Sequence, residues 1–383
     1  MIKPIIIIGS GFAAYQLVKT LRRENTQQAI TVITACEGDE YSKPDLSHVF
    51  SNKQTAADLV RMNALQFATE YNITLLTRHR VDSIDTLNKT LTANNKQFAY
   101  DKLVIATGAS AFVPPTEGDA ADRIITLNSL SEYKSAQEKL TTAESVLVIG
   151  AGLIGTEIAM DLNRSGRQVV LVDPAKSLLA ALLPDFIAAQ LYQSLGNSRV
   201  DINLGTQVSR LEQTSDEQSI NVTLSNGRTF QVDGVISAAG LKANTRLASE
   251  AGITCGRGII VDSKLQSSAR DVYALGDCAE IDGKLLPFLQ PILLSANALA
   301  KTLLGRPSEI KLPAMLVKVK TPHYPIQLCG NTTQAGARWQ IDAAAQGMTA
   351  KAFDDKNQLI GFVVTQDNMK QAFPLLRQLP AVL

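Results

Sequence analysis

The stretch Gly150-Ala151-Gly152-Leu153-Ile154-Gly155 decides the fold class of this chain. It follows an apolar run at 145–149 and opens a segment to about residue 164 whose apolar residues recur at helical spacing. A second apolar run lies at 168–172. Strand, glycine-rich turn, helix and strand form a βαβ unit, whose turn and helix N-terminus can hold the pyrophosphate of a dinucleotide. The complete GxGxxG pattern therefore predicts a dinucleotide-binding domain.

Asp173 directly follows the second apolar run, close to the spacing of about 20 residues at which an acidic side chain binds the ribose hydroxyls in this fold. An arginine for the 2′-phosphate of NADPH is not visible beside it, and the nearest cation is Lys176. Asp173 therefore favours NADH over NADPH.

The same plan occurs at the N-terminus. An apolar run at 4–8 precedes the turn Gly9-Ser10-Gly11-Phe12-Ala13-Ala14, a helical pattern to about residue 23, and a second run at 30–34. This GxGxxA variant, taken alone, is also compatible with an ordinary glycine turn. Two such units in one chain predict an α/β fold with two Rossmann-like domains. Glu37, just beyond the second run, is a candidate for the adenosine ribose, although a solvated loop glutamate is an equally good interpretation.

Further small-residue turns follow short apolar runs at 103–106, 235–239 and 272–275. They are Ala106-Thr107-Gly108, Ala239-Gly240 and Gly276-Asp277, and Asp277 could accept hydrogen bonds from a ribityl chain. Other short runs lie at 222–224 and 259–261, and an Ala- and Leu-rich helix is expected at about 292–304. From about residue 312 the pattern predicts strands at 315–320, 338–341, 348–353 and 359–364 and a last helix near 368–379, which together suggest a small α+β domain.

Composition excludes several classes of function. The formal net charge is +1, which argues against nucleic acid as the main partner. No run of about 18 apolar residues occurs, and the first apolar run ends at Gly9, too early for a signal peptide, so we expect a cytoplasmic protein without a membrane span. The four cysteines form no CxxC pair and there are only three histidines, so neither a disulfide framework nor a metal site is expected.

These motifs, with Glu157 behind the second turn and Tyr273 before Gly276-Asp277, resemble the two-dinucleotide-domain flavoprotein reductases over essentially the whole chain. The resemblance implies that the first turn and the Gly-Asp motif hold FAD and that the second turn holds NADH. It also implies an interrupted FAD domain. The expected division is 1–111 and 241–311 for FAD, 112–240 for NADH and 312–383 for the C-terminal domain.

Within this family, residues 41–48, 103–115, 286–291 and 312–322 resemble the rubredoxin reductases that serve flavorubredoxin in bacterial nitric oxide detoxification. The resemblance implies that Lys43 and Pro44 lie near the isoalloxazine and that Glu157 lies where nicotinamide meets flavin. A helix starting near Gln290-Pro291-Ile292 could point its positive N-terminus at the flavin pyrimidine edge, although its Ala-rich composition also suits plain core packing.

The departures from the family pattern are informative. The disulfide-reductase branch carries a Cys-x4-Cys pair that this chain lacks, and His48 follows Ser47 where oxidase relatives carry a reactive cysteine. Electrons should therefore leave the flavin directly. A Lys43–Glu157 or a His48–Glu157 ion pair is a further hypothesis.

A basic patch is expected near the acceptor. Between Arg306 and Gly330, four cations (Arg306, Lys311, Lys318, Lys320) minus Glu309 give +3 with His323 neutral. Lys318 and Lys320 would share a strand face and could dock an acidic rubredoxin-type protein, although a solvated strand face is an equally good interpretation. Two alternative functions stay open: a rubredoxin or ferredoxin reductase that serves an oxygenase, and an NADH-sensing flavoprotein interaction module.

Overall fold

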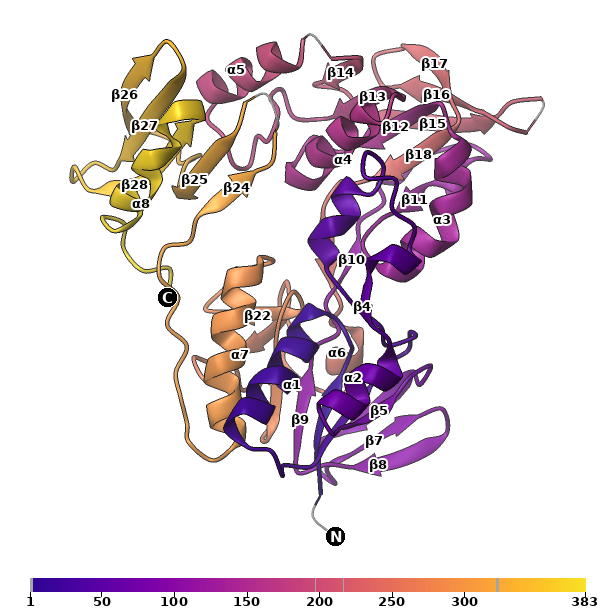
Figure 1. Cartoon of the computed structure of the whole chain (residues 1–383), viewed down its shortest axis with the longest axis vertical. Coiled ribbons are helices and arrows are strands. Elements are labelled where there is room, and N and C mark those ends of the chain that lie inside the picture. Colours follow the sequence, from indigo (N-terminus) through magenta and orange to yellow (C-terminus); the bar gives the residue numbers. More distant parts are fainter. Residues whose placement is uncertain (1–2, 197, 216, 322–323) are drawn as a thin grey trace.

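The computed structural model describes residues 3–196, 198–215, 217–321 and 324–383. Two parallel sheets and one antiparallel sheet organise the chain into three parts (Figure 1). Among the described residues, no helix combines the length and apolar character that crossing a membrane requires.

The first part is built on a sheet in the order β21-β9-β1-β2-β5. Its strands are β21 (Val272–Ala274), β9 (Lys102–Ile105), β1 (Ile5–Ile8), β2 (Ile30–Ile33) and β5 (Thr74–Leu76). All four isoleucines of β1 are buried, as expected for a parallel strand covered on both faces. One core joins this sheet to the packed helices α1 (Phe12–Glu24) and α7 (Leu289–Leu303) and to two small sheets, β6 (Val81–Asp85), β7 (Thr90–Ala93), β8 (Lys96–Ala99) and β20 (Ile259–Val261), β22 (Ala279–Ile281), β23 (Lys284–Leu285).

The second part repeats the plan in the order β11-β18-β12-β13-β14. Its strands are β11 (Ile125–Thr126), β18 (Gly234–Ser237), β12 (Ser145–Ile149), β13 (Gln168–Asp173) and β14 (Val200–Leu204). Alternate side chains of β12 enter different cores because successive residues of a strand point to opposite faces. Val146 and Val148 pack with α3 (Leu130–Thr142), α4 (Leu153–Arg164) and α5 (Asp185–Leu195). Leu147 and Ile149 pack with the meander β15 (Val208–Gln213), β16 (Ile220–Leu224), β17 (Thr229–Val232).

The third part is an antiparallel sheet in the order β24-β25-β28-β27-β26. Its strands are β24 (Val317–Val319), β25 (Ile326–Gly330), β28 (Leu359–Thr365), β27 (Gly347–Phe353) and β26 (Arg338–Ala344). One face shares a core with α5 and α4, and the other packs on α8 (Ala372–Leu376).

Two connections join the first two parts. The strands β10 (Ala109–Ala111) and β19 (Leu241–Ala243) pair antiparallel where the chain crosses between the sheets. The short helix η1 (Lys43–His48) contacts both α4 and α3, and a second short helix, η2 (Ala57–Leu59), follows it along the chain. The remaining elements are β3 (Glu40–Tyr41), β4 (Val60–Met62), α2 (Ala64–Glu70), η3 (Ala121–Arg123) and α6 (Arg246–Glu250).

The predicted strands agree with the observed ones to within two residues at each end, except that β26 continues three residues beyond its predicted end. The prediction of one helix near 368–379 is wrong. The chain forms the 3-10 helix η4 (Gln366–Gln371) and then the five-residue α8. Pro374 explains the break, since a proline in a continuous helix would lose a backbone N–H bond and clash with the carbonyl four residues earlier.

Candidate functional site

Three of the predicted segments meet at the carboxyl edge of the first sheet. Gly9 has φ +111°, and a Cβ there would lie 2.4 Å from the backbone oxygen of Ala106. A Cβ on Gly276 would lie 2.7 Å from the Cβ of Ala13. The turn 9–14 therefore lies directly against 106–108 and 276–277, and glycine is needed where the backbones approach.

The start of α1 is open to an anion. Its N-cap Gly11 carries no side-chain cap, and its first turn holds no acidic residue. A Cβ on Gly11 would meet nothing within 4 Å, so there is free space beside the N-cap of the helix. Amide groups at a helix N-terminus bind phosphates well. The residues present thus fit the pyrophosphate of the FAD that the family resemblance implies, and bound FAD would supply the exchange between two-electron and one-electron transfer.

Glu37 lies just past β2 and faces Arg78. Its carboxylate accepts hydrogen bonds of 2.8–3.1 Å from two guanidinium nitrogens of that arginine, and both side chains are largely exposed. An adenosine ribose bound by Glu37 would share the carboxylate with Arg78, so this role stays a prediction.

The second turn has the same construction as the first. A Cβ on Gly150 would lie 2.5 Å from the backbone oxygen of Ala238, and one on Gly155 would lie 1.8 Å from the oxygen of Gly150. The predicted turn Ala239-Gly240 therefore follows directly beside it. Gly152, the N-cap of α4, has open space and no side-chain cap, and Ile154 beyond Leu153 is 49% exposed. The start of α4 thus offers free amides beside an uncovered apolar side chain.

Asp173 ends β13 beside this turn, at the predicted place. Its Oδ2 accepts the backbone N–H of Ala151 at 2.6 Å, and its Oδ1 accepts that of Ala175 at 2.7 Å. The Asp173 carboxylate therefore stabilises the glycine-rich turn by hydrogen bonding. Its position beside the turn is also compatible with binding of a ribose.

Lys43 opens η1, with Pro44 at the next position. Its Nζ lies 3.5 Å from Oδ2 of Asp277, so two residues predicted to approach the flavin lie together. The Lys43–Glu157 pair that the sequence suggested is not the pair that forms, because Lys43 pairs with Asp277 instead.

Glu157 is 5% exposed on α4 and joins three parts of the chain. Its Oε2 accepts from the Ser47 hydroxyl at 3.0 Å, and its Oε1 accepts from the Lys320 backbone N–H at 3.3 Å. His48 points its Nε2 to the Lys320 ammonium at 3.4 Å, so the suggested His48–Glu157 pair is replaced by a His48–Lys320 contact.

Helix α7 begins at Leu289, one residue before the predicted Gln290-Pro291-Ile292. Gln290 is exposed, while Pro291 and Ile292 are buried. Neither a side-chain cap nor an acidic residue occupies the first turn. In Figure 1 this end of the helix points toward the middle of the molecule, and its own first turn contributes no negative charge against the positive end of the helix dipole.

Lys318 and Lys320, the two lysines expected to dock the acceptor, are both exposed, on either side of the buried Val319. Lys318 lies on β24, whereas Lys320 follows the strand. Lys320 therefore belongs both to the exposed basic surface and, through its backbone, to the Glu157 junction.

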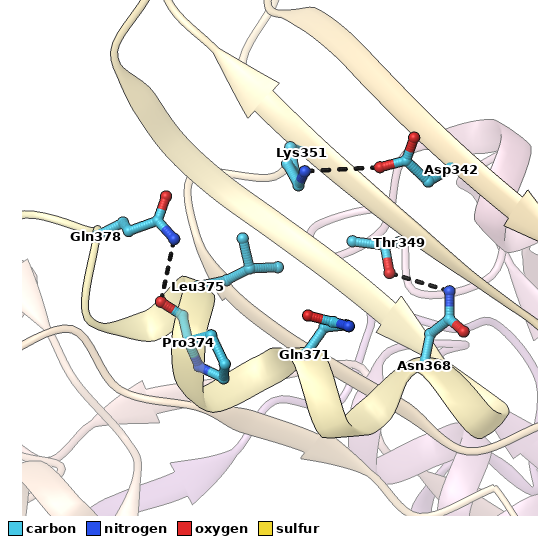
Figure 2. A pocket seen from close by; sticks show the side chains of 8 residues that line it. All are labelled: Asp342, Thr349, Lys351, Asn368, Gln371, Pro374, Leu375 and Gln378. Atoms are coloured by element: carbon cyan, nitrogen blue, oxygen red, sulfur yellow. Dashed lines mark hydrogen bonds and ion pairs between the residues drawn. The ribbon is translucent and has the colours of Figure 1, made fainter.

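A hollow of about 380 Å³ lies elsewhere, between the C-terminal sheet and α8 (Figure 2). The Lys351 ammonium lies 3.6 Å from the Asp342 carboxylate, and Asn368 donates to the Thr349 hydroxyl at 3.0 Å. These polar groups satisfy one another, and the lining contains no predicted site residue.

All four cysteines are free thiols. Cys278, next to Asp277, is fully buried, and burial raises the pKa of its thiol. Burial also raises the pKa of the Cys329 thiol. A buried, protonated thiol is a poor electron carrier, so neither of these two buried cysteines is suited to relay electrons.

Sequence reasoning missed Ser47 and Asp161, which hold the 43–51 stretch to α4. Asp161 lies four residues after Glu157, a spacing that puts both carboxylates on one face of the helix. That spacing was the available signal.

Comparison with known proteins agrees with this geometry. A family model described as pyridine nucleotide-disulphide oxidoreductase matches residues 3–300, and one described as rubredoxin binding C-terminal domain matches residues 309–379. Proteins named nitric oxide reductase FlRd-NAD(+) reductase are similar: that of Aliivibrio fischeri is 53% identical over 98% of both chains. That of Escherichia coli K12 is 50% identical over 98% of this chain and 99% of the relative.

Two solved structures share the fold. An NAD-dependent persulfide reductase from A. fulgidus has a TM-score of 0.88 and 25% identity, covering 98% of this chain and 76% of its own. Putidaredoxin reductase, solved in its covalent complex with putidaredoxin, has a TM-score of 0.86 and 22% identity, covering 99% and 94%. The chain therefore belongs to the pyridine nucleotide-disulphide oxidoreductase family, as the resemblance of its motifs implied.

Proposed function

We propose that the protein oxidises NADH and passes the electrons singly, through FAD, to the rubredoxin-type iron centre of a flavorubredoxin. The observation that carries this proposal is the junction at Glu157. There one carboxylate, carried by the NADH-side helix α4, accepts hydrogen bonds from Ser47 of the flavin-side stretch and from the backbone N–H of Lys320, directly after β24. The match of residues 309–379 to a rubredoxin-binding domain and the names of the relatives support the choice of acceptor.

The residues divide the work by position. The open N-termini of α1 and α4 would bind the pyrophosphates of FAD and NADH, with Asp173 on the ribose of NADH. Lys43, held against Asp277, would stabilise negative charge on the reduced flavin ring. Glu157 would orient the nicotinamide end. This assignment implies FAD-binding residues 1–111 and 241–311, NADH-binding residues 112–240 and a docking domain at 312–383.

The acceptor would dock beside β24. Lys318 and Lys320 present positive charge there, and an acidic iron protein would be attracted to it. Redox complexes bury small areas, often below about 1,200 Å², so charge would contribute much of the association rate. A cytoplasmic location would give access to both NADH and such an acceptor.

Stopped-flow absorbance tests the proposal. The protein, loaded with FAD, is reduced with NADH and then mixed with flavorubredoxin, with a simple rubredoxin or with a [2Fe–2S] ferredoxin. Fastest reoxidation by flavorubredoxin is expected. Faster reoxidation by the ferredoxin would instead identify a reductase that serves an oxygenase. Slow reoxidation by all three, with a long-lived charge-transfer band, would identify an NADH-sensing module and refute the proposal.

A further inference from the structure

Residues 43–56 form a flavin-side segment that belongs to the first part of the chain but lies on the second (Figure 1). Residues of helix α3 hydrogen-bond to its C-terminal end. The hydroxyl of Tyr133 donates to the Gln54 backbone oxygen at 2.6 Å, and the amide oxygen of Gln137 accepts the N–H of Ala56 at 2.7 Å. The segment is thus bound to the NADH-side helices along its length.

Three further hydrogen bonds of this segment centre on Asp161, which is 1% exposed on α4. Its Oδ2 accepts the backbone N–H of Phe50 at 2.8 Å and that of Ser51 at 3.2 Å. Its Oδ1 accepts the hydroxyl of Ser51. Burial of a carboxylate is costly unless several donors meet it, and here all three donors come from the flavin-side segment. Charge-assisted bonds of this kind are about twice as strong as neutral ones.

The side chain of Phe50 is fixed as well. The Arg167 guanidinium lies 5.6 Å from the centroid of its ring, and the ring of Tyr133 meets it edge-on at 6.4 Å. The backbone and the side chain of Phe50 are therefore both held by residues of the NADH-side half. Phe50 lies seven residues after Lys43, whose side chain contacts Asp277.

We propose that Asp161 is a positioning residue for hydride transfer. It fixes the flavin-side segment to the helix whose first turn would bind NADH, and so sets where Lys43 stands relative to that turn. The inference rests on the proposed function, because it assigns Lys43 to the flavin ring. Misplacement of a reacting partner by about 1 Å can lower the rate about a hundredfold. A residue that fixes the position of the flavin-side segment can therefore affect the rate of hydride transfer strongly.

Asp161→Asn is the test, and the chain offers a matched control. Asp233 also accepts two consecutive backbone N–H groups, of Glu144 and Ser145, and the Ser145 hydroxyl, but it lies away from the flavin-side segment. NADH oxidation with a small neutral quinone is measured on both FAD-loaded variants, together with hydrogen exchange of residues 43–56 by mass spectrometry. For Asp161→Asn we expect about a tenfold lower kcat, a KM for NADH within about twofold, and faster exchange in the segment.

Asp233→Asn should leave kcat, KM and exchange of the segment unchanged. If the two variants behave alike, Asp161 is only a structural carboxylate and the inference is wrong. Should Asp161→Asn fail to fold, Ser51→Ala removes one donor only. It should accelerate exchange at residues 50 and 51 and lower kcat by about threefold, and unchanged values would overturn the inference. Slow transfer from the wild type to every iron acceptor, with the quinone effect of Asp161→Asn intact, would refute the proposed function alone.

Discussion

Glu157 and Lys320 are joined by a hydrogen bond of 3.3 Å between the carboxylate Oε1 and the lysine backbone N–H. Because the lysine contributes its main chain, the bond does not depend on the identity of its side chain. The Lys320 ammonium is free to contact His48 on the surface. Substitution of the side chain therefore tests docking without breaking the link between the C-terminal sheet and α4.

Reversal of both charges, Lys318→Glu with Lys320→Glu, should slow reduction of an acidic flavorubredoxin by about tenfold at low salt, because attraction becomes repulsion. The difference in rate between wild type and variant should shrink as the salt concentration rises, because salt shortens the Debye length. Stopped-flow reoxidation at several salt concentrations measures this. Lys356→Glu with Lys370→Glu is the control, since it makes the same charge change at exposed sites of the same domain. If the Lys318→Glu, Lys320→Glu variant reduces a neutral quinone more slowly by the same factor, the docking role is refuted. It is also refuted if the control variant slows flavorubredoxin reduction equally.

Asp173→Ala should raise the KM for NADH about ten- to a hundredfold, because a lost hydrogen bond to a charged group costs about 1.5–3 kcal/mol. The carboxylate also braces the turn through Ala151, so bracing must be separated from ribose binding. Reduced nicotinamide mononucleotide lacks the adenosine ribose and serves as the second substrate. Its kcat/KM should be unchanged if Asp173 binds that ribose, and a parallel loss with both substrates would mean that only the turn has been disturbed.

Prediction from sequence succeeds here where the physics is local. The glycine turns were identified because tight turns and close backbone approach demand small residues at fixed spacing, and Gly9, Gly150 and Gly155 meet those demands. The partners of Glu157 were not found, since Ser47 and Lys320 lie 110 and 163 residues away along the chain. Contacts of that kind depend on how the three parts pack, which no local pattern records.

Gly11 and Gly152 separate the two nucleotide sites. Both have ordinary negative φ values, −76° and −72°, and a Cβ on either would meet no atom within 4 Å. Both alanine variants should therefore fold without backbone strain, while the added methyl group would occupy space needed by a pyrophosphate. Gly11→Ala should purify with at least about tenfold weaker FAD binding, a loss of about 1.4 kcal/mol or more, and Gly152→Ala should keep FAD but raise the KM for NADH about tenfold.

Visible absorbance per protein measures FAD retention, and circular dichroism confirms the fold of both variants. A yellow Gly11→Ala protein with undiminished FAD affinity would contradict the assignment of the first turn. If Gly152→Ala loses FAD and Gly11→Ala raises the KM for NADH, the two nucleotide sites are the reverse of this assignment.

Asp233 gives a pH-dependent prediction for stability. Burial alone would raise its pKa, but hydrogen bonds from the backbone and hydroxyl of Ser145, the backbone of Glu144 and the hydroxyl of Ser219 hold the pKa below its ordinary value. A depressed pKa means that the ionised form stabilises the fold above the unfolded pKa of about 3.9, and that this contribution is lost as the pH falls through the folded value.

Asp233→Asn should therefore lower the Tm by about 5 °C at pH 7, where the charged acceptor is lost. The gap between wild type and variant should narrow steadily below about pH 4, because the wild-type carboxylate then becomes protonated as well. Thermal unfolding followed by circular dichroism from pH 7 to pH 3 measures both curves. A gap that stays constant across this range would show that the hydrogen bonds to Asp233 do not depend on its charge.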